Sequence, residues 1–186
     1  SMGILLTNDF NKNLAEYFAS KYLYPDLTDH GKPDIRKLVE QPWHQYKLSD
    51  FERLLNFYKN PILFILGSDL PDFNTYQKAL VTSMDGYNRT NAIWSLFGLH
   101  LGNGENFLSC SGLLSLSNEF IKKDFGEESI EYVKLCYWLG WTRKKIDDTL
   151  GAKYWFLKAK GIILRSSIKG CEDYLKWCKM ELESEN

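Results

Sequence analysis

"NAIWSLFGLHLG" at residues 91–102 and "VKLCYWLGWTRK" at residues 133–144 are two helix-like stretches built on the same pattern. In each of them a large apolar residue is followed at once by a glycine (Phe97-Gly98 and Leu139-Gly140). Glycine inside a helix costs about 0.5–1 kcal/mol relative to alanine. Two glycines at the same place in the pattern therefore call for a compensating contact.

The positions after the two glycines also correspond, at an offset of 42 residues. A small residue, a large apolar residue and another small residue follow each glycine at the same spacing: Cys110, Leu114 and Ser117, then Ala152, Phe156 and Ala159. Two antiparallel helices approach closely where one offers a small residue and the other fills the notch. We therefore predict hairpins in which Gly98 lies against a helix at 105–123, and Gly140 lies against Ala152 or Phe156.

Helical spacing of apolar residues extends over most of the chain, and no strand-like alternation of useful length interrupts it. Pro25 and Pro42 are expected to end helices, Pro61 to interrupt one, and Ser49 with Glu52 to form a capping box. The expected helices are 8–24, 35–41, 50–60, 62–66, 70–84, 89–101, 105–123, 128–143, 147–165 and 168–183. The sequence thus predicts an all-α fold.

The two stretches resemble the tetratricopeptide repeat (TPR), whose pattern is W-x2-L-G-x2-Y…A-x3-F. The first unit matches it with Trp94, Phe97, Gly98, Leu101, Cys110 and Leu114, and the second with Leu139, Gly140, Ala152 and Phe156. The period of 42 is longer than the usual 34 and is similar to that of the kinesin-light-chain type, with "FGEES" at 125–129 in the place of its loop. The sequence departs from the pattern at Cys136 and Arg143, and no proline closes either unit.

The resemblance implies antiparallel helical hairpins stacked as a short TPR-like array. A single all-α domain is expected over 2–186, with irregular N-terminal helices at 2–88, two TPR-like hairpins at 89–165 and a capping helix at 166–183. Gly67 and Ala79 are also twelve residues apart, which leaves open a degenerate third unit. The alternative is a non-repetitive helical bundle.

Composition excludes several classes of partner. The net charge of −1 gives no field that would attract nucleic acid or a membrane surface. The longest apolar run, near residues 61–67, is too short to span a bilayer, and no signal peptide is recognisable. The four cysteines form no C-x-x-C pair, so we expect free thiols in a reducing compartment and a cytoplasmic location.

Motifs for catalysis or metal binding are not found. His30, His44 and His100 form no H-E-x-x-H motif and lie at no ligand spacing from a cysteine. Asp147-Asp148 is expected to begin a helix, where carboxylates favour the positive end of the dipole. The sequence therefore predicts no metal, no cofactor and no enzymatic activity.

The helix at 128–143 holds more aromatic residues than one buried stripe can take. Tyr137 and Trp141 lie off the Leu139-Gly140 stripe, with Lys134 and Lys144 beside them. In TPR proteins the first helix of each hairpin lines a concave groove, so the resemblance implies that these four residues point into it. Packing of the rings beneath the N-terminal segment is the alternative.

These observations favour a non-catalytic module that binds a protein or peptide in a concave helical groove. Rings beside cations suit a partner with an acidic or apolar segment. A small immunity protein or antitoxin that inhibits one enzyme is a second hypothesis. The third is an enzyme with a site built from scattered loop residues such as Asp29, His30 and His44.

Overall fold

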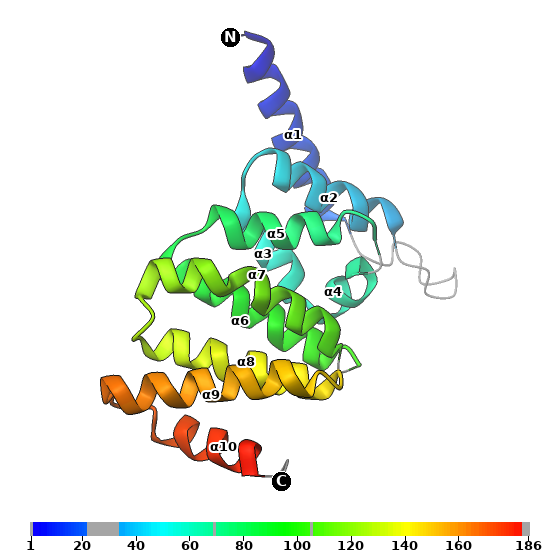
Figure 1. The fold of residues 1–186 in the computed structure, drawn as a ribbon. Coiled ribbons are helices and arrows are strands. Elements are labelled where there is room, and N and C mark those ends of the chain that lie inside the picture. The colour runs from blue at the N-terminus through cyan, green and yellow to red at the C-terminus, as the bar shows by residue number, and fades with distance from the viewer. Residues whose placement is uncertain (1, 22–33, 69, 105, 184–186) are drawn as a thin grey trace. The chain divides into compact units, whose positions relative to one another are not determined.

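The computed structural model describes residues 2–21, 34–68, 70–104 and 106–183. Of these residues 84% are helical and none lies in a strand, which confirms the all-α prediction. The helices are α1 (Met2–Ser20), α2 (Ile35–Lys47), α3 (Phe51–Lys59), α4 (Pro61–Ser68), α5 (Phe73–Ser83), α6 (Gly86–Gly102), α7 (Phe107–Phe125), α8 (Ile130–Lys145), α9 (Thr149–Ser166) and α10 (Glu172–Glu183) (Figure 1).

The chain forms two compact units. The N-terminal unit covers Ser1–Ser83 and the C-terminal unit covers Met84–Asn186. The N-terminal unit holds α1 to α5 and the C-terminal unit holds α6 to α10. The border precedes α6, which begins at Gly86 and not at the expected residue 89.

In the N-terminal unit, α1 packs on α2, and α3 packs on α2, α4 and α5. Large side chains from four of its helices are fully buried: Leu38, Leu54, Tyr58, Phe64 and Leu80. The Tyr58 ring lies 5.1 Å from the Phe73 ring in an edge-on contact, so aromatic packing joins α3 to α5. Helices α2 to α5 each contribute apolar side chains to this core, whereas in α1 Ala15 and Phe18 are buried but Phe10 and Tyr17 are exposed.

Three features of the helices in this unit differ from the predictions. The first is α1, which spans Met2–Ser20 and not 8–24, so it ends before Pro25, which lies outside the described residues.

Second, Pro42 lies inside α2 instead of ending it. A proline in a helix interior costs about 3 kcal/mol, but Leu38, His44 and Gln45 on either side of it are buried, and this packing keeps the helix continuous.

The start of α3 is the third difference, because no capping box forms at Ser49. Asp50 is the N-cap residue, and its carboxylate accepts a hydrogen bond from the Arg53 backbone N–H at 3.2 Å. The expected break at Pro61 is confirmed, since Pro61 is the first residue of α4.

In the C-terminal unit each helix packs on the next one along the chain, and α10 also contacts α8 (Figure 1). The two expected pairs, α6 with α7 and α8 with α9, are formed. Arg89 near the start of α6 is buried and forms an ion pair at 2.5 Å with the partly buried Asp124 near the end of α7. The first pair is therefore antiparallel, as predicted.

The glycine prediction is confirmed at Gly140. A Cβ atom built there would lie 2.8 Å from Cδ1 and Cε1 of Phe156, so only glycine leaves room for that ring. Phe156 and Ala152 are fully buried. The notch between α8 and α9 is thus filled as the spacing predicted.

The same prediction is wrong at Gly98. A Cβ atom there would meet nothing within 4 Å, and the residue is exposed. The close approach of α6 and α7 is made by Cys110 instead, whose Sγ lies 3.9 Å from the Phe97 carbonyl oxygen. The small residue on α7 therefore supplies the contact that was expected from the glycine on α6.

The start of α9 follows the prediction for Asp147-Asp148. Asp148 is the N-cap residue, and its carboxylate accepts a hydrogen bond from the Gly151 backbone N–H at 2.9 Å. This hydrogen bond, followed by the guanidinium of Arg143 at 3.0 Å, holds the pKa of Asp148 below its usual range. The Asp148 carboxylate therefore has a structural role at this turn.

Candidate functional site

A hollow of about 330 Å³ lies between three helices of the C-terminal unit, and we call it the α6–α8–α10 groove. Its lining combines two aromatic rings, one aliphatic side chain, one hydroxyl and two opposite charges: Thr90, Trp94, Ile130, Glu131, Lys134 and Tyr174. Such a mixture of apolar surface with a few polar groups is typical of ligand-binding hollows.

Helix geometry explains why these residues meet. Thr90 and Trp94 are four residues apart on α6, and Ile130 and Lys134 are four residues apart on α8, so each pair shares one face. Ser129 fixes the start of α8, because its hydroxyl accepts a hydrogen bond from the Tyr132 backbone N–H at 3.2 Å. The first turn of α10 supplies Tyr174.

Lys134 is the cation of the groove. Its ammonium lies 4.2 Å from the centroid of the Trp94 ring, a cation–π distance. Burial lowers the pKa of Lys134, and the carboxylate of Glu131 opposes that shift. The lysine is thus half-buried against an aromatic wall, next to one acidic residue.

An aromatic cluster extends from the groove across the three helices. Its members are Trp94 and Phe97 on α6, Tyr137, Trp138 and Trp141 on α8, and Tyr174 and Trp177 on α10. Trp138 is central, with its ring 5.3 Å from Phe97, 5.4 Å from Tyr137 and 5.3 Å from Trp141. The rings meet mainly edge to face, which is a favourable arrangement for aromatic pairs.

The four residues predicted to bind a partner do not converge. Lys134 lines the groove. Tyr137 is only 8% exposed, because the rings of Tyr174 and Trp177 on α10 pack against it at 5.5 Å. Tyr137 is therefore covered by α10, and it is neither open to the groove nor, as the alternative predicts, packed only beneath the N-terminal segment.

Trp141 and Lys144 lie further along α8. Trp141 is half-buried, with its ring 5.3 Å from Phe107 and 5.4 Å from the Lys145 ammonium. Lys144 forms an ion pair with Glu181 on α10, at 2.8 Å between Nζ and Oε2. Neither residue lines the groove.

Sequence reasoning missed Trp94, Trp138 and Tyr174 as groove or cluster residues. The repeat pattern marks Trp94 only as a repeat position, and it says nothing of Trp138 or Tyr174. The spacing within one helix identifies a face, but it does not say which two other helices that face meets. Their convergence is visible only in three dimensions.

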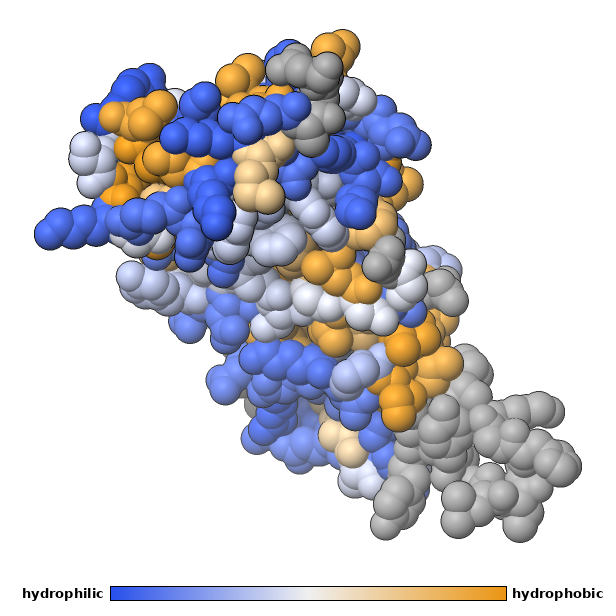
Figure 2. Space-filling view, turned by 90° about the horizontal axis from the view of Figure 1, so that it is seen from below, coloured by the Kyte–Doolittle hydropathy of each residue, from blue (hydrophilic) through white to orange (hydrophobic). Residues whose placement is uncertain are grey.

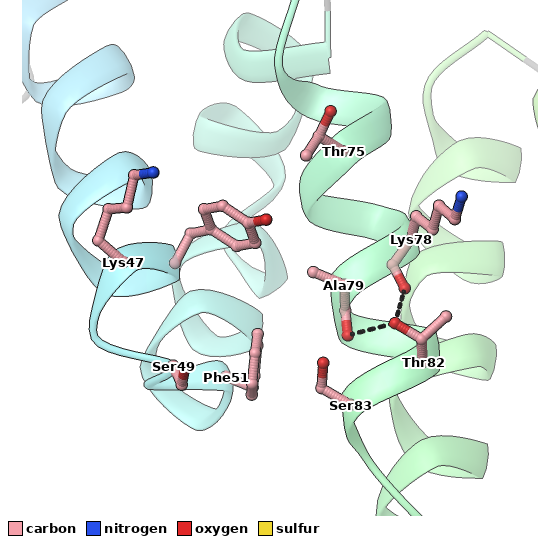
Figure 3. Close-up of a pocket in the computed structure, with 9 residues that line it drawn as sticks. Lys47, Ser49, Phe51, Thr75, Lys78, Ala79, Thr82 and Ser83 are labelled. Atoms are coloured by element: carbon pink, nitrogen blue, oxygen red, sulfur yellow. Dashed lines mark hydrogen bonds between the residues drawn. The ribbon is translucent and has the colours of Figure 1, made fainter.

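A second, more polar hollow of about 660 Å³ lies in the N-terminal unit (Figure 3). Two lysines, four hydroxyl groups of serine and threonine, a tyrosine, a phenylalanine and an alanine line it: Lys47, Lys78, Ser49, Thr75, Thr82, Ser83, Tyr46, Phe51 and Ala79. Thr82 donates its hydroxyl hydrogen bond to the Lys78 carbonyl at 2.9 Å. The C-terminal ends of α2 and α5 lie at this hollow, and the C-terminal end of a helix dipole is negative. These dipoles disfavour a bound anion, whereas the two lysines favour one.

Of the three loop residues considered for an enzymatic site, the structure describes only His44. His44 is buried, and its Nδ1 lies 2.9 Å from the Asn11 side-chain oxygen, which ties α2 to α1. Burial lowers the pKa of His44, and Glu40 opposes the shift. Asp29 and His30 lie outside the described residues.

Within the described ranges, no group of three or more His, Cys, Asp or Glu side chains could hold a metal ion. No helix in the same part of the chain is both long and apolar enough to cross a membrane. Comparison of the chain with protein-family models, with curated proteins and with solved structures finds no match.

Proposed function

We propose that the protein is a non-catalytic module that binds a segment of another protein in the α6–α8–α10 groove. The observation that carries the proposal is that Trp94, Tyr174 and Lys134, from three different helices, are all partly exposed around one hollow. Partly buried rings beside a cation are typical of binding hot spots. The aromatic cluster behind them holds these side chains in place before a partner arrives, which lowers the entropic cost of binding.

The lining also suggests the chemistry of the bound segment. Trp94, Ile130 and Tyr174 offer apolar surface, and the half-buried ammonium of Lys134 favours a carboxylate. Glu131 beside it disfavours a second negative charge on that side of the groove. The best-fitting segment is therefore apolar or aromatic with one acidic residue.

TPR-like architecture is part of the same proposal. In such an array α6 with α7 and α8 with α9 are the hairpins and α10 is the capping helix, and the sequential packing of α6 to α10 supports this assignment. The contact of Gly140 with Phe156 supports it for the second hairpin, whereas the open position of Gly98 is a departure in the first. The four buried free thiols support a reducing compartment, the cytoplasm.

Selection from a peptide library displayed on phage tests the proposal. Peptides would be selected on the parent protein and counter-selected on a Trp94→Ala variant, and enriched peptides would then be titrated by calorimetry. We expect peptides with an apolar or aromatic residue next to one acidic residue, bound at least about tenfold more weakly by Trp94→Ala and by Lys134→Glu.

Two variants outside the groove provide matched controls. Tyr87→Ala removes an exposed ring from α6, and Lys179→Glu reverses an exposed charge on α10. Both should bind the selected peptides with the parent affinity. Peptides that bind equally well to the parent, Trp94→Ala and Lys134→Glu proteins would exclude the groove as the binding site.

A further inference from the structure

The outward face of α9 carries an apolar stripe, defined by Leu150, Tyr154, Leu157, Gly161 and Leu164. The four large side chains are 84%, 57%, 50% and 59% exposed in chain order. They recur every three or four residues, so they lie along one side of the helix. The opposite side of α9 is the buried one, with Ala152, Phe156, Ala159, Ile162 and Ile163 in the core.

A helix that is apolar on both sides is unusual on the surface of a protein, because one side normally faces water with polar residues. Hydrophobic residues do reach the surface in clusters among hydrophilic ones on the face drawn in Figure 2. Single exposed apolar residues need no explanation, but a continuous exposed stripe is typical of an interaction surface. The α9 stripe runs over four helical turns.

The charged residues that α9 itself places beside the stripe are all basic. Helical spacing places Lys153 and Lys160 along one edge of the stripe, and Lys158 and Arg165 along the other. Neither aspartate nor glutamate occurs between Thr149 and Ser166. Asp147 and Asp148 precede the helix, and Glu127 lies 3.6 Å from Lys158 and 3.3 Å from Lys122.

The stripe also has a notch in its second half. A hollow of about 740 Å³ lies beside it, and Tyr154, Leu157, Gly161 and Leu164 form its apolar lining. A Cβ atom built on Gly161 would meet nothing within 4 Å. The same molecule shows what such a glycine can receive, since Gly140 accepts the ring of Phe156.

We infer that the α9 stripe docks an amphipathic helix of a partner protein, with a large apolar residue over Gly161 and acidic residues along both of its edges. The basic edges provide the charge complementarity. A second copy of this chain is disfavoured, because a two-fold contact would bring the same basic edges together. A lipid surface would accept the basic and apolar residues but would not use a notch of this shape.

This surface is separate from the α6–α8–α10 groove, since no residue lines both. The inference therefore does not depend on the proposed function. A variant in the groove and a variant on the stripe distinguish the two surfaces in one experiment.

The test uses two synthetic helical peptides of 18 residues, the length of α9. Both carry the same apolar stripe with a central phenylalanine, one with glutamate and one with lysine along its edges. Fluorescence anisotropy with the full-length protein should show binding of the glutamate peptide, weakening as salt is raised, and at least about tenfold weaker binding of the lysine peptide.

Variants then locate the contact. Leu157→Glu and Gly161→Leu should each lower the affinity for the glutamate peptide at least about tenfold. Trp94→Ala in the groove should leave this affinity unchanged. Leu157 is exposed and a Cβ atom on Gly161 would meet open space, so circular dichroism should confirm that both stripe variants stay folded.

Several results would overturn the inference. They are equal binding of the two peptides, no binding of either, or loss of binding in Trp94→Ala but not in Leu157→Glu. Sedimentation of the parent as a dimer that Leu157→Glu dissociates would assign the stripe to a second copy. Binding to phosphatidylserine vesicles that depends on Leu157 would assign it to a membrane.

Discussion

Gly140 and Gly98 occupy the same position of the repeat pattern but face different surroundings. Gly140→Ala should lower the free energy of unfolding by about 1–3 kcal/mol, because its methyl group would overlap the Phe156 ring. Gly98→Ala should raise it by about 0.5–1 kcal/mol, because the methyl group meets open space and alanine is the better helix former. Urea unfolding of both variants measures the two changes, and a shift of the same sign in both would contradict the assignment.

Phe156 provides the complementary test of this contact. Phe156→Ala should cost about 3–5 kcal/mol, since the ring is fully buried between α8 and α9. In the double variant Gly140→Ala with Phe156→Ala, the added methyl group has no ring to overlap. We therefore expect the double variant to be more stable than the sum of the two single changes indicates, and strict additivity would show that the two sites do not touch.

His100 makes stability depend on pH. Burial lowers its pKa from 6.5 to about 4, so the folded protein keeps this imidazole neutral while the unfolded chain protonates it below 6.5. The unfolded state therefore binds more protons between these values, and stability falls as the pH falls from 6.5 towards 4, by about 2–3 kcal/mol from this group. His44 contributes in the same direction, since burial lowers its pKa too.

The imidazole proton signals in NMR spectra measure this directly. The His100 signal should titrate with a midpoint near 4, assigned by its loss in His100→Gln, and the urea midpoint of that variant should vary less between pH 7 and pH 5 than that of the parent. A His100 midpoint close to 6.5 would refute the prediction.

At the scale of elements, α10 covers one side of the aromatic cluster. Deleting residues 171–186 should expose Tyr137 and Trp138, shift tryptophan emission to longer wavelength and lower the free energy of unfolding. Glu181→Gln is the control, because it weakens the partly exposed ion pair with Lys144, keeps the size of the side chain and should cost no more than about 1 kcal/mol. Unchanged emission after the deletion would mean that α10 does not shield these rings.

The sequence predicted the helices well because periodicity, caps and glycines act locally. The contact of Gly140 with Phe156 and the cap at Asp148 could be predicted for that reason. Pro42 was misjudged because burial of neighbouring residues outweighs a local penalty, which one sequence does not reveal. Tyr137 was placed at the groove because its own helix shows only that it lies off the main stripe, and α10 covers it from elsewhere in the chain.

At the scale of the whole molecule, the two compact units lead to a prediction about fragments. The C-terminal unit has its own core, with Leu96, Leu114, Tyr132, Leu135 and Phe156 fully buried. A fragment of residues 84–186 should therefore give a helical circular dichroism spectrum and unfold cooperatively in urea. Urea unfolding of a fragment of residues 1–83 provides the comparison. If the fragment 84–186 shows no cooperative transition, its core needs the rest of the chain.

The distribution of thiols makes opening of one part of this protein measurable by chemical labelling. Its four cysteines, Cys110, Cys136, Cys171 and Cys178, are fully buried, and all belong to the C-terminal unit. Burial raises the pKa of Cys110, Cys136 and Cys178 to about 12, so these thiols are both shielded and protonated in the folded state. An alkylating reagent can therefore react with these thiols only when the C-terminal unit opens, so the alkylation rate reports how often that unit opens. The N-terminal unit has no cysteine, so its opening does not contribute to this rate.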